Sequence, residues 1–217
     1  MNRSDAEILW EVASVLARDA ANVSRGAGRG GPNLPPLLFF TDPARTPRPW
    51  ETAARLPLGA GVVFRAFGAA DARETGLRLR EATRERRGLL LIGLDPKLAE
   101  AVEADGVHLP ERALAQAASL AASHPRWRIT GAVHSAAALA GAEALDAAVL
   151  SPVFAAGGAS ANRPTLGVKG FRDAARGSPV PVYALGGVDG GNARELIGSG
   201  ACGLAAVSGI RTAFGPA

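Results

Sequence analysis

Tyr183-Ala-Leu-Gly-Gly-Val-Asp-Gly-Gly-Asn192 and its continuation Cys202-Gly-Leu-Ala-Ala-Val-Ser-Gly-Ile210 decide the fold. In each stretch a short apolar run ends on small residues, and a helical stretch separates the two. Glycines at the ends of two neighbouring strands let backbone N–H groups approach an anion closely. The two stretches therefore predict the last strands of a repeating strand–helix protein, with a phosphate site at their ends. The predicted phosphate-binding residues are Gly186, Gly187, Val207, Ser208 and Gly209.

The rest of the chain repeats the same pattern of short apolar runs separated by mostly helical stretches. The runs are nearly continuous in apolar residues, which is typical of parallel strands buried on both faces. Eight such units predict closure into an α/β (βα)8 TIM barrel, in which the loops after strands seven and eight commonly bind phosphate. The predicted strands are Leu37–Thr41, Gly61–Arg65, Leu89–Ile92, Gly106–Leu109, Ile129–Val133, Ala147–Val153, Val180–Leu185 and Gly203–Val207.

The two ends of the chain depart from this regular pattern. Ser4 and Glu7 form a capping box that predicts an N-terminal helix ending near Asn22. The Gly/Pro-rich stretch that follows has no strand before it and no helix after it, so it is interpreted as a linker rather than a dinucleotide motif. Few residues follow the eighth run, which predicts a truncated final helix, with the N-terminal helix or a subunit contact covering the gap. The expected division is an N-terminal helix and linker at 1–36 and the barrel at 37–217.

Length and composition exclude several classes of function. The 217 residues fit one domain, and the net charge of +4 comes from arginines scattered among acids, which indicates no nucleic-acid partner. Cys202 is the only cysteine, which is typical of a reducing compartment, and its apolar surroundings predict a buried, inert thiol. No apolar run is long enough for a membrane span and no signal pattern opens the chain, so a cytoplasmic protein without a membrane partner is expected.

Short motifs at the strand ends carry a family resemblance. They include Gly131-Ala-Val-His-Ser135, Leu150-Ser-Pro-Val-Phe154, Thr165-Leu-Gly167, Leu185-Gly-Gly-Val188 and Ala206-Val-Ser-Gly-Ile210. In this order and spacing they resemble the thiamine phosphate synthase and thiazole tautomerase (TenI-like) superfamily, over about residues 37 to 210. The resemblance implies a barrel enzyme of thiamine metabolism whose partner is a small phosphorylated molecule.

Departures from the family pattern bear on the reaction. The synthases join a pyrimidine diphosphate to a thiazole phosphate, and the resemblance implies Mg²⁺ and cations held by a Gln-x-Arg-Glu-Lys stretch, an Asn-Asp-Arg stretch, a further Asp and a loop Lys. Here Val63-Phe-Arg-Ala-Phe67 keeps only Arg65, while Leu94 and Ala113 replace the two acids. The loop Ala155–Arg163 has no Lys. The diphosphate half of the site is therefore expected to be lost and the thiazole-phosphate half kept.

His134 carries the leading hypothesis, a metal-independent thiazole tautomerase-like isomerase with no cofactor. The Val-His-Ser form resembles that of the tautomerases, whose reaction is a 1,3 proton shift that one imidazole can perform. His134 could instead only hydrogen-bond a loop or a helix start. Arg65 could pair with a substrate carboxylate or with a protein acid. Ser135 and Gly167 are further candidates for substrate binding, although capping of the next helix is the favoured role of Ser135.

Two other functions stay open at this point. One is thiamine phosphate synthase itself, in which Mg²⁺ would be the cofactor and Asp95 or Glu111 could supply replacement ligands. The other is a non-catalytic relative that binds a phosphorylated metabolite. The oligomeric state stays open too, with a homodimer as one alternative.

Structural roles are expected for several other side chains. His108 points along the fourth strand and is predicted to be structural, and His124 is predicted to face solvent. Phe64 and Phe67 are predicted to fill the core. Asp42 is predicted to cap the turn that follows the first strand.

Overall fold

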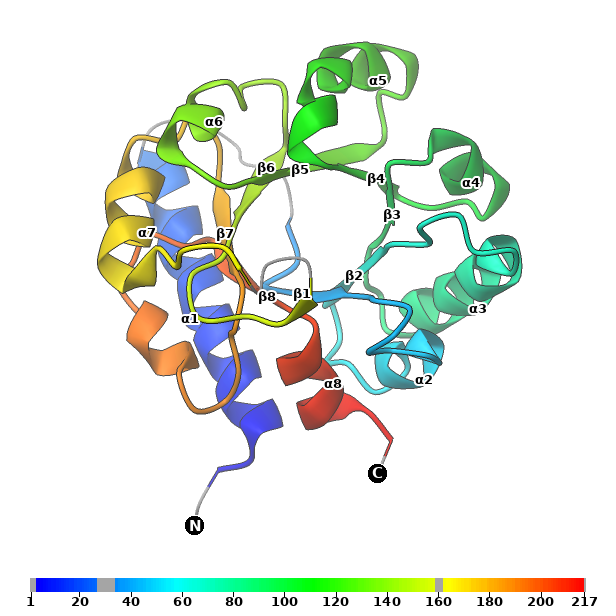
Figure 1. Ribbon diagram of the computed structural model, residues 1–217, viewed down its shortest axis with the longest axis horizontal. Coiled ribbons are helices and arrows are strands. Elements are labelled where there is room, and N and C mark those ends of the chain that lie inside the picture. The colour runs from blue at the N-terminus through cyan, green and yellow to red at the C-terminus, as the bar shows by residue number, and fades with distance from the viewer. Residues whose placement is uncertain (1–2, 27–33, 159–161, 217) are drawn as a thin grey trace.

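The computed structural model describes residues 3–26, 34–158 and 162–216. Most of the segment interpreted as a linker, residues 27–33, lies outside these ranges. The part of the chain that the structure describes includes the barrel and the helix that precedes it (Figure 1).

Eight parallel strands form a closed barrel in sequence order, with β1 paired to β8. Leu37 lies opposite Leu204 across the closing pair. The predicted (βα)8 barrel is confirmed. The strands are β1 Leu37–Phe40, β2 Gly61–Phe64, β3 Leu90–Gly93, β4 Gly106–Leu109, β5 Arg128–Val133, β6 Ala147–Leu150, β7 Val182–Leu185 and β8 Gly203–Ala206.

The helical segments surround the barrel (Figure 1). Between β7 and β8 the chain forms the 3₁₀ turn η3, which is shorter than the helical stretch that the sequence predicts between these two strands. Within the described residues, no helix combines the length and apolar character that crossing a bilayer requires. The segments are α1 Asp5–Gly26, α2 Pro49–Ala53, α3 Ala72–Glu85, α4 Pro96–Ala101, η1 Glu111–Gln116, α5 Ala117–Ser123, α6 Ala136–Ala140, α7 Gly167–Arg176, η3 Ala193–Leu196 and α8 Ser208–Phe214.

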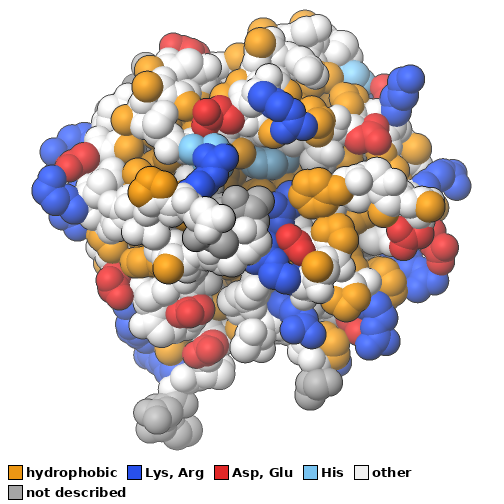
Figure 2. Space-filling view, viewed as in Figure 1, with side chains coloured by type: hydrophobic (Ala, Val, Ile, Leu, Met, Phe, Trp, Pro, Cys, Tyr) orange, Lys and Arg blue, Asp and Glu red, His pale blue; other side chains and the backbone are white. Residues whose placement is uncertain are grey.

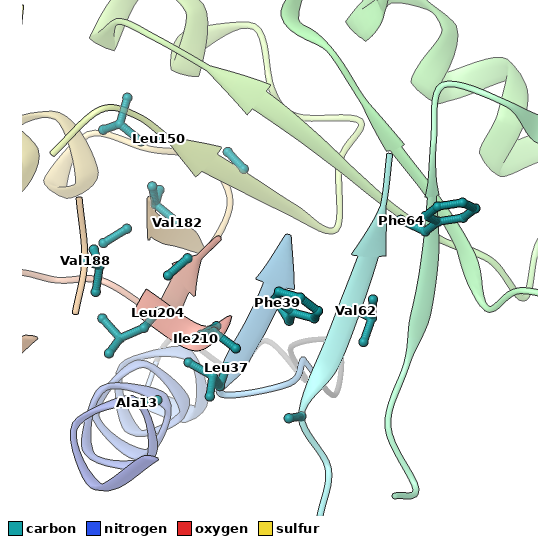
Figure 3. Packing of buried hydrophobic residues seen from close by; sticks show 14 of the residues in the cluster. Ala13, Leu37, Phe39, Val62, Phe64, Leu150, Val182, Val188, Leu204 and Ile210 are labelled. Carbon is teal, nitrogen blue, oxygen red and sulfur yellow. The ribbon is translucent and has the colours of Figure 1, made fainter. Parts of the chain in front are cut away.

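Alternate residues of the strands divide the core into two clusters. Phe39 and Val62 pack in one cluster with helix residues such as Leu9 and Leu79. Figure 3 shows part of this layer between the strands and α1. Nearly all buried members of the second cluster are strand residues. This cluster fills the inside of the barrel. Its buried members are Leu38, Phe40, Val63, Leu91, Ala147, Val149, Tyr183, Cys202 and Ala205.

Helix α1 begins with the predicted capping box. The Glu7 carboxylate accepts hydrogen bonds from the backbone N–H and the hydroxyl of Ser4, at 2.8 and 2.9 Å. The helix continues to Gly26, past the expected end near Asn22. It packs on β8, η3 and α8. The N-terminal helix therefore covers the strand that the short α8 leaves open, as the sequence predicts.

His108, on β4, is buried inside the barrel. Its Nδ1 is 2.9 Å from the Thr130 hydroxyl oxygen, and its ring meets the Phe40 ring edge-on at 5.0 Å. Burial and, to a smaller extent, the nearby positive charge of Arg65 together lower the pKa of His108 to about 3. The side chain is therefore neutral near pH 7.

We expect the free energy of unfolding to fall as the pH drops from about 6.5 toward 4. In this window the unfolded chain protonates His108 at its ordinary pKa of about 6.5 whereas the folded protein does not. The contribution is at most about 1.4 kcal/mol per pH unit. Urea unfolding at several pH values measures it, and His108→Gln removes this component of the slope.

His124 provides the matched control for that measurement. It is half-buried rather than facing solvent as predicted, because its ring stacks on Trp127 at 3.7 Å and its Nε2 lies 3.0 Å from a Glu100 oxygen. The variant His124→Gln should keep the His108 component of the pH slope. Equal slopes for the wild type and His108→Gln would contradict the assignment.

Candidate functional site

A cavity of about 590 Å³ opens at the carboxyl ends of the strands. Loops after β1, β2, β6, β7 and β8 contribute to its wall, and so does Asp5 at the start of α1. On the face shown in Figure 2, Lys and Arg side chains gather near the centre, beside histidine and acidic side chains. The residues predicted from the sequence that line the cavity are Arg65, Gly186, Gly187, Val207, Ser208 and Gly209.

The two glycines after β7 lie directly against the loop that follows β6. Gly186 has φ +104°, and a Cβ there would come within 2.6 Å of Pro152 Cα. Gly187 has φ +64°, and a Cβ there would come within 2.3 Å of the Ala155 carbonyl oxygen. Phe154 N–H also donates to the Gly186 carbonyl at 3.0 Å. Close packing thus requires these glycines independently of any ligand, a reason that the sequence motif does not reveal.

A cluster of one acid and two arginines forms the β1 and β2 side of the cavity. Asp42 caps its turn as predicted, since its Oδ1 accepts the N–H groups of Ala44 and Arg45 at 3.2 Å. Its Oδ2 accepts a hydrogen bond of 2.9 Å from Arg45 Nη2 and lies 3.8 Å from Arg65 Nη2. Arg65 Nε donates to the Thr41 carbonyl at 2.7 Å. Arg65 therefore both contacts a protein acid and reaches the cavity.

The Asp42 carboxyl and the Arg65 guanidinium both remain ionised. The hydrogen bond from Arg45 holds the pKa of the Asp42 carboxyl below its usual value, and the charge of Arg65 acts in the same direction. Burial lowers the pKa of Arg65, while the Asp42 carboxylate opposes that effect. Because arginine titrates far above neutral pH, the guanidinium stays protonated near pH 7.

Phe67 does not fill the core, contrary to the sequence-based prediction. Its side chain is 71% exposed, its backbone has φ +49°, and it lines the cavity. The left-handed backbone turns the ring away from the barrel, and the Arg65 guanidinium carbon lies 5.5 Å from the ring centre. Phe64, by contrast, is buried as predicted.

His134 follows β5 and is fixed by three hydrogen-bond contacts. Its backbone N–H donates to Glu111 Oε2 at 2.7 Å. Its ring Nδ1 lies 2.9 Å from the Ser151 carbonyl and 3.3 Å from the Ser151 hydroxyl oxygen. Because a carbonyl only accepts, Nδ1 carries the hydrogen in the neutral ring and Nε2 keeps a free lone pair.

The structure separates His134 from the cavity that holds the other candidates. His134 is not among the described residues that line it. The end of β6 connects the two places, because Ser151 contacts the imidazole and the next residue, Pro152, packs on Gly186. His134 follows β5 and the glycine loop follows β7, so the adjacent residues Ser151 and Pro152, directly after β6, lie between them.

Ser135 and Gly167 also lie outside the cavity wall. The Ser135 hydroxyl oxygen accepts the Ala138 N–H at 3.1 Å and caps α6, the role favoured from the sequence. Gly167 N–H donates to the Val153 carbonyl at 2.9 Å at the start of α7. Both groups already have protein partners.

The acids considered as replacement metal ligands have structural partners too. Asp95 Oδ1 accepts the Leu98 N–H at 2.9 Å and caps α4, and Glu111 accepts from His134. Leu94 and Ala113 have no donor atoms in their side chains. Among the described residues, no three His, Cys, Asp or Glu groups are placed to hold a metal ion. The two acids that the resemblance implies for an Mg²⁺ site are therefore absent from these positions, where Leu94 and Ala113 stand.

We expect Gly187→Ala to destabilise the protein and displace the loop after β6. Gly198→Ala is the control, because Gly198 has a similar φ of +74° but no atom within 4 Å of an added Cβ. The control should lose about 1 kcal/mol from backbone strain, and Gly187→Ala about 1–3 kcal/mol more from steric overlap. Thermal and urea unfolding compare them, and equal losses would contradict the close-packing account.

Comparison with known proteins identifies the family. A family model described as thiamine monophosphate synthase matches residues 44–210. The thiamine-phosphate synthase of Archaeoglobus fulgidus is 30% identical over 185 residues, 83% of this chain and 87% of that protein. That of Chlorobium luteolum is 32% identical over 192 residues, 85% of this chain and 89% of that protein. The structure of a thiamine phosphate pyrophosphorylase from Pyrococcus furiosus superposes with a TM-score of 0.70 at 26% identity, covering 82% of this chain and 91% of that one. This chain belongs to the thiamine monophosphate synthase family.

Proposed function

We propose that this protein binds a thiazole phosphate and catalyses a metal-independent proton shift of the thiazole tautomerase type. The observation that carries the proposal is the fixed imidazole of His134. Its Nδ1–H is held by the Ser151 carbonyl at 2.9 Å, which leaves the Nε2 lone pair for a substrate proton. A base with a defined tautomer at a strand end suits proton transfer without any other reactant.

The binding half of the proposal rests on the cavity. The glycine loop after β7 and the start of α8 line it, and their backbone N–H groups are the proposed donors to the phosphate. The first N–H groups of a helix have no acceptor within the helix, so Ser208 and Gly209 can offer theirs to a ligand. Arg65 would pair with a carboxylate of the substrate.

In the proposed reaction His134 acts as both base and acid. Its Nε2 takes a proton from one position of the dearomatised ring and returns a proton two atoms away, so no atom is gained or lost. The positive charge that forms on the imidazole strengthens the bond from Nδ1–H to Ser151, which stabilises the intermediate. Because His134 lies across the end of β6 from the glycine loop, the bound substrate has to extend past Pro152.

A second candidate is thiamine phosphate synthase, which the names of the Archaeoglobus and Chlorobium relatives favour. That reaction expels diphosphate, whose developing charge requires a cation. The positions implied for the metal and its neighbouring cation hold Leu94, Ala113 and Phe67 in this chain, which weighs against it.

We expect the purified protein to convert the dearomatised carboxythiazole phosphate tautomer to its aromatic isomer, followed by NMR. His134→Asn should slow the conversion by about 10²–10⁴-fold, the usual contribution of general acid–base catalysis. His124→Asn is the matched control and should leave the rate unchanged. The proposal is overturned if the wild type does not accelerate the conversion, or if His134→Asn is as fast as the wild type.

The second candidate has its own test. We expect no thiamine phosphate from the pyrimidine diphosphate and thiazole phosphate in the presence of Mg²⁺, because the residues that would hold the metal are replaced. Magnesium-dependent product formation would establish the synthase reaction instead. Binding of thiazole phosphate with no turnover in either assay would identify a non-catalytic relative.

A further inference from the structure

We propose that Arg45, together with Arg65, forms a carboxylate-binding subsite on the β1 and β2 side of the cavity. The ligand would then carry a carboxylate in addition to its phosphate, and Arg45 would determine specificity for it. This inference rests on the proposed function, which assigns the substrate carboxylate to Arg65. It extends that function by adding Arg45, which belongs to none of the sequence motifs.

The turn after β1 fixes Arg45 before any ligand binds. The Thr46 hydroxyl accepts the Asp42 N–H and donates to the Asp42 carbonyl, both at 2.8 Å, which closes the turn. Arg45 is anchored there through its own N–H and its Nη2, which both donate to the Asp42 carboxylate. Gly158 of the loop after β6 lies so close that a Cβ there would be 2.9 Å from Arg45 Nη2. The guanidinium is therefore held at the cavity wall.

Both arginines have buried nitrogen atoms that lack an acceptor. Within the described residues, Arg45 Nε and Arg65 Nη2 are buried and have no hydrogen-bond partner. Buried donors in folded proteins are nearly always paired, so unpaired ones in a cavity wall indicate a missing acceptor. The planar guanidinium is suited to an acceptor with two oxygens, such as a carboxylate.

The charge of the cluster favours a carboxylate over a diphosphate. Arg45 and Arg65 share one acid, Asp42, which leaves one positive charge in excess. A carboxylate carries one negative charge and matches that excess, whereas a diphosphate would need further cations. The neighbouring exposed side chains, Phe67 and Leu94, provide none.

Two further acids, Asp189 and Asp5, lie in the cavity wall. Asp189 follows β7, and its Oδ1 accepts the N–H groups of Gly191 and Asn192 at 2.9 and 3.2 Å. Asp5 lies against Gly190, where an added Cβ would meet its carboxylate. Both acids contact the loop after β7, whereas the acid paired with Arg45 and Arg65 is Asp42.

The two rings beside Arg65 are compatible with an anion at its edge. The Arg65 guanidinium carbon lies 5.6 Å from the Phe40 ring centre and 5.5 Å from that of Phe67. Because the rings contact the guanidinium as a cation, its Nη2 remains available for an acceptor, while its Nε already donates to Thr41. The exposed, left-handed Phe67 gains little from burial, which fits a ring that contacts a planar ligand.

The test measures binding rather than turnover, so it can fail independently of the proposed reaction. Isothermal titration compares the aromatic carboxythiazole phosphate with the same thiazole phosphate lacking the carboxylate. The wild type should bind the carboxylated compound about tenfold tighter or more, the factor expected for one charge-assisted hydrogen bond. Arg45→Gln should reduce this preference to less than about threefold, and Arg45→Lys, which keeps the charge but not the planar fork, should give an intermediate value.

Arg48→Gln is the matched control, because Arg48 has a side chain 65% exposed in an ion pair with Glu51 and is not part of the cavity wall. It should keep the wild-type preference. The subsite is overturned if the wild type binds both compounds equally or binds neither, or if folded Arg45→Gln or Arg45→Lys keeps the full preference. A tenfold preference of the wild type for the carboxylated compound, with no isomerisation of the dearomatised tautomer, would support the subsite and reject the proposed reaction.

Discussion

The pairing of β1 with β8 closes the sheet and brings the loops of the cavity together. Leu37 opposite Leu204 and Phe39 opposite Ala206 fix the register of this pair. Closure places the ends of β7, β8, β1 and β2 side by side. The glycines Gly186 and Gly187 therefore line the same cavity as Arg45 and Arg65. Helix α1 packs on β8, where the short α8 would otherwise leave apolar surface exposed to water.

The glycine loop after β7 illustrates how one residue type meets two requirements. Gly186 and Gly187 allow the loop after β6 to lie on them, and the same lack of a side chain leaves backbone N–H groups at the cavity. Because packing alone requires both glycines, their presence is weaker support for a phosphate site than the motif suggests. The cavity they share with Arg65 is the stronger argument, since it places positive charge and small residues together.

The assignment to the family and the proposed chemistry rest on different parts of the barrel. The fold is the one expected of a thiamine monophosphate synthase relative. The side chains beside Arg65 are not those expected, because Phe67 and Leu94 provide apolar surface where the resemblance implies charge. Shared ancestry therefore establishes the scaffold, while the reaction depends on a few side chains at the strand ends. The proton-shift proposal is built on those side chains and not on the names of the relatives.

The sequence by itself determined the barrel, the α1 capping box, the turn at Asp42 and the cap at Ser135. Each of these depends on apolar periodicity or on hydrogen bonds between residues close in the chain, so local patterns encode them. Only the tertiary structure decided that Arg45 joins Arg65, that Phe67 is exposed and that His134 lies across β6 from the cavity. These outcomes depend on strand register and on how loops distant in sequence pack against one another. No local pattern reports such contacts, because the partners meet only after the barrel has closed.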